Sequence, residues 1–230
     1  PFGLAAPVAP VAAGLLALAF GWFCVRLRGV YFAMLTLAFA QISWSIVFQW
    51  DSFTGGSNGV FGVWPSAWLA GKTAYYYLAL AFCGAGIALL WRVLFSPFGY
   101  ALRAGRDSPL RAETIGIDLR AYQWGAFVLV GALAGLAGAV YAFSKGSISP
   151  STISIAQSTD GLIMVLLGGV ETLTGPVVGA AIFTWLRDLL ARETDFWRAA
   201  LGLMILLIVV VFPQGLVGGL KALYVRWRPA

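Results

Sequence analysis

The sequence predicts an all-α protein that crosses a membrane several times. Of its 230 residues, 60% are hydrophobic and only 10% are charged, whereas soluble domains contain about 25% charged residues. The chain also has 28 glycines and 10 tryptophans. Glycine is frequent where membrane helices pack closely, and tryptophan gathers at the bilayer interface. We therefore expect a polytopic transmembrane helical bundle with about seven hydrophobic segments.

The first four hydrophobic segments are long enough to cross a bilayer, whose hydrocarbon core requires about 20 apolar residues. We expect the first helix to begin at a proline, because proline favours the first helical position. A glycine-rich loop separates the second segment from the third. The four segments are Pro10–Leu27, Val30–Trp50, Ala74–Phe95 and Gln123–Phe143.

Residues 156–190 are too long for one span of about 30 Å, at about 1.5 Å per helical residue. The stretch GGVETLTGP at 168–176 interrupts them with glycine and proline. We expect two short helices, near Ala156–Leu167 and Val177–Leu190. These helices either cross the membrane twice or form a re-entrant hairpin. A last span, Ala199–Phe212, ends before a proline and a basic tail.

A charged island, residues 96–122, lies between two spans and holds four arginines and three acidic residues. Arginine-rich loops lie on the cytoplasmic side, so we expect this segment there, together with residues 26–28. Ser108 can cap a two-turn helix that begins at Pro109, and Gly116 can end it in a left-handed conformation. Such a helix is either a rigid knob that docks in a groove of a partner or an interfacial helix that touches only lipid headgroups.

Several polar residues mark a possible path for a small solute. Polar side chains within a span usually face the bundle or a cavity, and successive glycines let N–H groups converge on a carboxylate. The alternatives are hydrogen bonds between helices for the span residues and a flexible turn for the TGGSNG loop. Asp160, in the expected helix near Ala156–Leu167, can either bind the ammonium group of an amino acid or balance the dipole at the N-terminus of that helix. The candidate pathway residues are Thr36, Gln41, Gly55, Gly56, Ser57, Asn58 and Asp160.

Two features shape the fourth span. Asp118 can cap the helix that leads into it. The pairs Gly131-x3-Gly135 and Ala134-x3-Gly138 place small residues on neighbouring faces, so that other backbones can approach closely. This pattern predicts helix packing and implies no chemistry.

The sequence gives no sign of an enzyme. Gly71-Lys72-Thr73 is not a phosphate-binding loop, because position 66 is serine where that motif needs glycine. The chain has no histidine, the commonest general base and metal ligand, and we expect neither catalytic residues nor a metal site. Its net charge of +6 lies in short loops between spans, which argues against a nucleic-acid partner.

Four stretches resemble the LivM-type permease subunit of branched-chain amino acid ABC importers. They are RLRGVYFAMLTLAFAQ at 26–41, TGGSNGV at 54–60, AETIGID at 112–118 and LLGGVETLTGPVVGA at 166–180. The resemblance covers nearly the whole chain. It departs at Asn58, where this family often has aspartate, and at the start, which lacks the expected first spans. We therefore expect residues 1–230 to form a single transmembrane permease domain, truncated at its N-terminus.

The resemblance implies a heteromer in the bacterial inner (plasma) membrane. Its partners are a second homologous permease subunit, two ATP-binding subunits and a periplasmic solute-binding protein, within membrane lipid. ATP and Mg²⁺ belong to the ATP-binding subunits, so we expect no cofactor in this chain. Urea or short-amide importers share the same pattern, and a secondary transporter is a more distant alternative. The residues implied to couple to the ATPases are Arg106, Ser108, Pro109, Arg111, Glu113 and Gly116.

Overall fold

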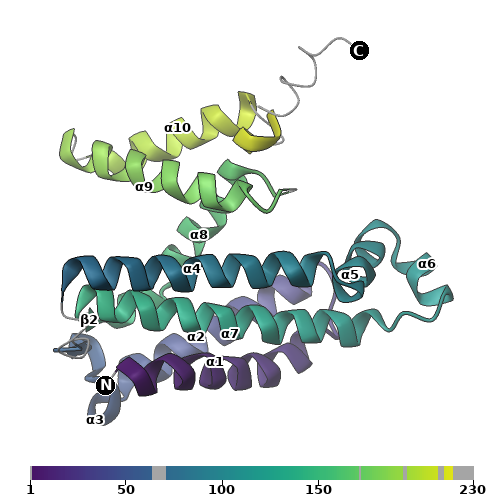
Figure 1. Cartoon of the computed structure of the whole chain (residues 1–230), viewed down its shortest axis with the longest axis horizontal. Coiled ribbons are helices and arrows are strands. Elements are labelled where there is room, and N and C mark those ends of the chain that lie inside the picture. Colours follow the sequence, from purple (N-terminus) through teal and green to yellow (C-terminus); the bar gives the residue numbers. More distant parts are fainter. Residues whose placement is uncertain (1, 64–70, 171, 194–195, 212–214, 220–230) are drawn as a thin grey trace. The chain divides into compact units, whose positions relative to one another are not determined.

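The computed structural model describes residues 2–63, 71–170, 172–193, 196–211 and 215–219, almost all of them helical (Figure 1). The chain divides into two compact units, Pro1–Ser154 and Ile155–Ala230. The all-α prediction is confirmed.

The first unit contains four long helices joined by shorter elements. Its helices are α1 (Phe2–Cys24), α2 (Val30–Gln49), α3 (Asp51–Thr54), α4 (Lys72–Leu94), α5 (Pro97–Asp107), α6 (Pro109–Thr114) and α7 (Leu119–Lys145). The 3-10 turns η1 (Gly56–Asn58) and η3 (Pro150–Ile153) and the two-residue strands β1 (Val60–Phe61) and β2 (Ser147–Ile148) complete it.

Four of these helices, α1, α2, α4 and α7, are long and apolar enough to cross a membrane. They are the four spans predicted from the sequence. The predicted start of the first span at Pro10 is wrong, because α1 begins at Phe2 and contains both Pro7 and Pro10. Proline at the first helical position is only a preference, and membrane helices tolerate internal proline where other groups satisfy the freed carbonyl.

Helices α1 and α7 pack against each other through small residues. A Cβ at Gly135 would lie 2.5 Å from Ala13 Cβ and 2.7 Å from the Ala9 carbonyl oxygen, and a Cβ at Gly131 would collide with Ala17. The predicted glycine packing face is therefore confirmed. Near the other end of the contact, the indole Nε1 of Trp124 donates a hydrogen bond of 3.0 Å to a backbone carbonyl of α1.

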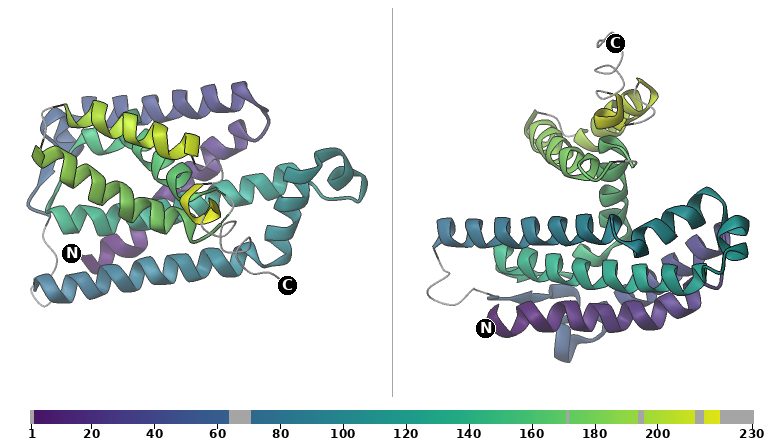
Figure 2. Two further views of the ribbon diagram at one scale, coloured as in Figure 1. Left: turned by 90° about the horizontal axis from the view of Figure 1, so that it is seen from above. Right: turned by 45° about the vertical axis from the view of Figure 1, so that its right-hand side comes forward.

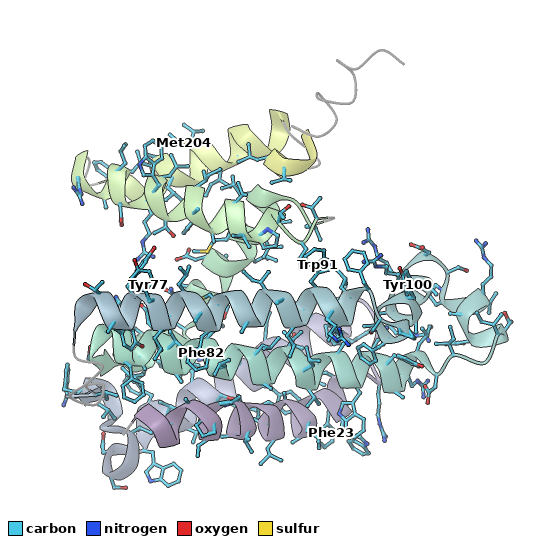
Figure 3. All side chains as sticks on the ribbon, viewed as in Figure 1. Phe23, Tyr77, Phe82, Trp91, Tyr100 and Met204 are labelled. Carbon is cyan, nitrogen blue, oxygen red and sulfur yellow. The ribbon has the colours of Figure 1, made fainter. Side chains whose placement is uncertain are left out.

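Aromatic side chains mark both ends of α4. Tyr76 and Tyr77 are exposed near its start, and Trp91 is exposed near its end. Figure 3 shows Tyr77 at one end of the helix, and Trp91 and Tyr100 at the end that leads into α5. Tyrosine and tryptophan favour the two membrane–water interfaces, so these positions bracket an apolar stretch that suits a spanning helix.

The second unit contains α8 (Ile155–Gly168), α9 (Gly175–Glu193) and α10 (Trp197–Val211). Leu167, Phe183 and Leu201, one from each helix, form its buried core, and α9 and α10 lie side by side (Figure 2).

The predicted break between two short helices is confirmed in this unit. At about 1.5 Å per residue, α8 is about 21 Å long, shorter than the hydrocarbon core. A Cβ at Gly179 would collide with the Met164 carbonyl, so glycine permits the close approach of α9 to α8. Glu171, within the break, lies outside the described residues.

We predict that Gly135→Ala destabilises the protein by about 1–3 kcal/mol, the usual cost of overpacking, because the added methyl group forces α1 and α7 apart. The measurement is the thermal unfolding midpoint of purified protein in detergent. Gly138→Ala is the matched control in the same helix, because a Cβ there has no neighbour within 4 Å. Equal effects of the two substitutions would contradict the packing role of Gly135.

Candidate functional site

The charged island folds into a compact helical corner between α4 and α7. Helix α6, Pro109–Thr114, is the short helix predicted from the sequence, and Gly116 follows it with a φ of +87°. The amide of Ile117 donates to the Ala112 carbonyl at 3.1 Å and that of Gly116 to the Glu113 carbonyl at 3.1 Å. These bonds satisfy carbonyls at the helix end, as glycine in the left-handed region permits.

Of the two helix caps predicted for the corner, Asp118 forms its capping hydrogen bonds and Ser108 forms none among the described residues. Asp118 caps α7, because its Oδ1 accepts hydrogen bonds from the amides of Arg120 at 3.1 Å and Ala121 at 3.3 Å. Ser108 occupies the N-cap position of α6, but its hydroxyl makes no capping hydrogen bond within the described part of the chain. Only its carbonyl takes part in the first turn, accepting from the Ala112 amide at 3.1 Å.

Sequence analysis missed α5, the longer helix of the corner. Ser96 and Pro97 stand at its N-cap and first positions, which was a usable signal. Gly99, Ala101 and Gly105 are buried along α5, and a Cβ at Gly105 would collide with the side chain of Leu119. Gly105 therefore seats α5 on the start of α7, while Gly99 lies against the end of α4.

An ion pair joins this corner to the turn between α1 and α2. The Arg28 guanidinium Nη2 donates a hydrogen bond to Glu113 Oε1 at 3.2 Å. Both side chains are exposed, at 73% and 49%, so the pair contributes about 0–1 kcal/mol to stability. The sequence had assigned Arg28 only to membrane orientation, because 85 residues separate it from Glu113 and no local pattern joins them.

The outer surface of the corner presents apolar and basic side chains together. Leu110 is 74% exposed and Ile115 73%, and the arginines Arg106 and Arg111 are also exposed. Arg111 and Ile115 line a small groove with Asp107 and three neighbours from α5 and α6. The arginines were expected from the sequence, whereas the exposed Leu110 and Ile115 were not.

The TGGSNG loop is ordered by specific contacts. The Thr54 hydroxyl donates to backbone carbonyls of α2 and the following turn at 2.6 and 2.7 Å. Gly55 and Gly56 have φ angles of +72° and +55°, and a Cβ at Gly56 would overlap the carboxylate of Asp51. A carboxylate of this chain therefore occupies the space beside Gly56. Ser57 and Asn58 are exposed.

A short strand pair ties this loop to the end of α7. Strands β1 and β2 are antiparallel, with Val60 opposite Ile148 and Phe61 opposite Ser147. The amides of Gly62 and Val63 both donate to the Gly146 carbonyl at 3.1 Å. This strand pair was not predicted, because two-residue strands are too short for an alternating hydrophobic pattern to be visible.

The polar residues of α2 bond within their own helix. The Thr36 hydroxyl donates to the Ala33 carbonyl at 2.8 Å, and two serines of α2 bond along the same helix at 2.8 and 3.0 Å. Among the described residues, these hydroxyls therefore form hydrogen bonds within α2 and none to another helix. Gln41 is exposed and has no hydrogen-bond partner among the described residues. At about 100° per residue, Thr36 and Gln41 point in different directions around α2.

Asp160 lies in the second unit, where it faces Arg187. Its Oδ2 is 4.0 Å from Arg187 Nη1, and both side chains are partly exposed. Asp160 is the sixth residue of α8, and the first turn of that helix has no acidic residue. The alternative that it balances the helix dipole at the N-terminus is therefore wrong. Arg187 was missed, since nothing in the sequence indicated which face of α9 meets α8.

The described residues contain no group of three or more potential metal ligands.

A family model described as "Branched-chain amino acid transport system / permease component" matches residues 2–212. The chain is 27% identical over 238 residues to the high-affinity branched-chain amino acid transport system permease protein LivM of Escherichia coli (strain K12), covering 91% of this chain and 56% of that protein. The chain spans about half the length of such relatives. No solved structure matches it.

Other relatives have names that refer to different solutes. The chain is 28% identical over 239 residues to the autoinducer 2 import system permease protein LsrC of Escherichia coli (strain SMS-3-5 / SECEC), covering 91% of this chain and 64% of that protein. It is 44% identical over 68 residues to the nucleoside ABC transporter permease protein NupC of Lactococcus lactis subsp. cremoris (strain MG1363), covering 29% and 22%.

We predict that the Asp160–Arg187 pair is energetically coupled. Asp160→Asn or Arg187→Gln removes one member of this ion pair, whereas the double variant removes both. The unfolding free energies in detergent should give a coupling energy of about 0.5–1 kcal/mol for these partly exposed groups. Asp188→Asn, at the exposed neighbour of Arg187, is the control. Additive effects of the two single substitutions would contradict the pairing.

Proposed function

The chain belongs to the family of branched-chain amino acid transport permeases, and on that premise we propose that it is the membrane-spanning subunit of an ATP-driven ABC importer for branched-chain or similar hydrophobic amino acids. The observation that supports this most strongly is the similarity to LivM over 91% of the chain. The family alone does not determine the solute, because the relatives named LsrC and NupC are permeases for other solutes. Urea or a short amide is the alternative solute.

We place the charged island, residues 96–122, on the cytoplasmic side of a bacterial inner membrane, as its arginine content favours. The whole transporter then includes a second homologous permease subunit, two ATP-binding subunits and a periplasmic solute-binding protein. ATP and Mg²⁺ bind to the ATP-binding subunits, and this chain contributes the path and the coupling surface.

The corner formed by α5 and α6 is the proposed coupling surface. Its exposed Leu110 and Ile115 suit an apolar groove on an ATP-binding subunit, and Arg106 and Arg111 flank them. Exposed apolar side chains with a polar rim are typical of docking surfaces. Gly116 ends α6 so that these side chains are held outward.

The corner is rigidly attached to a spanning helix, which gives the coupling a mechanical route. Leu119 packs against Gly105, Asp118 caps α7, and α7 packs on α1 along its glycine face. Movement of an ATP-binding subunit therefore displaces α6 together with α7 and α1, which opens or closes the solute path by alternating access.

For the solute path we keep the exposed Ser57 and Asn58 at one mouth as the best placed of the residues expected from the sequence. Gly55 and Gly56 shape this loop, and Asp51 occupies the space beside Gly56. Thr36 and Gln41 on α2 and Asp160 on α8 are weaker candidates. A secondary transporter, the rival interpretation, would need free buried carboxylates to bind a cation. The partly exposed Asp160 instead has Arg187 as a neighbour at 4.0 Å.

The function is tested by reconstituting the complete transporter, with its partner subunits and binding protein, in proteoliposomes. We expect ATP-dependent uptake of leucine, isoleucine and valine, and no uptake when ATP is replaced by a non-hydrolysable analogue. Urea is assayed in parallel. Uptake of urea alone would support the alternative solute, and uptake driven by an ion gradient without ATP would contradict the ABC importer assignment.

The coupling surface is tested by charge exchange between Arg28 and Glu113. We expect Glu113→Arg to reduce stimulation of ATP hydrolysis by the liganded binding protein about fivefold, the factor that about 1 kcal/mol produces. The double variant Arg28→Glu/Glu113→Arg should recover part of the stimulation, because the pair is restored with reversed polarity.

The control for this exchange is Arg92→Glu, which alters a cytoplasmic charge at the end of α4 outside the corner. A pull-down of the ATP-binding subunits distinguishes failed docking from failed stimulation. If Glu113→Arg recruits and stimulates them normally, residues 108–116 are not the coupling element.

A further inference from the structure

A groove with a volume of about 680 Å³ lies at the end of the first unit that carries α5 and α6. Its walls come from the turn between α1 and α2, from α5 and the start of α6, and from one face of α7. Most of the wall is apolar. The apolar residues that matter most are Phe32, Leu102, Ala126, Phe127, Val130 and Ala134.

The polar side chains of the groove are gathered at one end. Arg28 is in the turn between α1 and α2, and Arg120 and Gln123 are in the first turns of α7. Ala134 lies about 20 Å further along α7, at about 1.5 Å per residue. None of the described residues that line the groove is acidic. The groove therefore has a cationic mouth and a long apolar floor.

The two arginines have donors available. Arg28 uses Nη2 for Glu113, but a guanidinium has five N–H donors. Arg120 forms no ion pair or ring contact within the described part of the chain, and its side chain is exposed. Arginine binds phosphate oxygens by paired, charge-assisted hydrogen bonds.

We propose that this groove binds the headgroup and an acyl chain of one anionic phospholipid. The phosphate would lie between Arg28 and Arg120, and the acyl chain along the apolar face of α7. The cytoplasmic orientation given above places the mouth at the leaflet that carries anionic lipids, where basic pockets between spans bind their headgroups. A free phosphate ion would leave the apolar floor unfilled. An apolar protein helix would desolvate Arg120 without a counter-charge, since Glu113 balances only Arg28.

The experiment measures lipid retention by the purified, complete transporter. The complex is exchanged into detergent with phosphatidylglycerol or phosphatidylcholine, and bound lipid is counted by native mass spectrometry. We expect preferential retention of phosphatidylglycerol, and a roughly fivefold loss of that retention in Arg120→Gln. Arg92→Gln, a basic residue of the same side outside the groove, should retain phosphatidylglycerol like the wild type.

A second variant tests the apolar floor without changing charge. Ala134→Trp should fill the groove and lower the retention of phosphatidylglycerol, while intact subunit composition in the same spectra reports folding. Equal retention of the two lipids by the wild type, or equal loss in the Arg120 and Arg92 variants, would overturn the proposal. Displacement of the lipid by millimolar inorganic phosphate would assign the mouth to a free anion and overturn it as well.

A photoreactive side chain at Val130 distinguishes a lipid from a protein occupant. We expect crosslinks to phospholipid in native membranes. Crosslinks to another subunit, with no lipid adduct, would overturn the proposal and identify the groove as a protein interface.

Discussion

The close approach of α1 and α7 is the interaction on which the rest of the first unit depends. Lipid tails are as apolar as the side chains of the helices, so burial of apolar surface does not drive helix association within a bilayer. What remains is dense packing, and Gly131 and Gly135 permit it by bringing the two backbones together. By contrast α2 contains no fully buried residue, and it contacts α1 through the stacked rings of Phe20 and Phe39.

Specific contacts hold both ends of α7. At its start, Asp118 caps the helix and Leu119 packs on Gly105. Beyond its end, Gly146 accepts two hydrogen bonds from the segment that follows β1. In the proposed mechanism, a displacement of the α5–α6 corner would be passed along α7 to the loop that holds Ser57 and Asn58. The proposed coupling and the proposed solute path are connected through one helix.

The sequence predicted the features that depend on composition and on local backbone chemistry. Apolar length identified four spans, and glycine and proline identified the break between α8 and α9. Gly116 ends α6 in a left-handed conformation and Asp118 caps α7, as expected from the sequence. The failures are of another kind. Arg28 meets Glu113, and Arg187 meets Asp160, across distances in sequence that no local pattern encodes. The predicted start of the first helix at Pro10 was wrong, because proline favours the first helical position but can also lie inside a membrane helix.

Arg28 connects the two surfaces proposed for the cytoplasmic end. One of its donors holds Glu113 on α6, and its guanidinium also lines the groove that we assign to an anionic lipid. In the proposed lipid site, a phosphate at the groove mouth would attract this guanidinium, while Glu113 attracts it toward the corner. The exposed Arg28–Glu113 pair contributes only about 0–1 kcal/mol on its own. A phosphate beside Arg28 would therefore compete with a weak contact, and the two proposals meet at this one side chain.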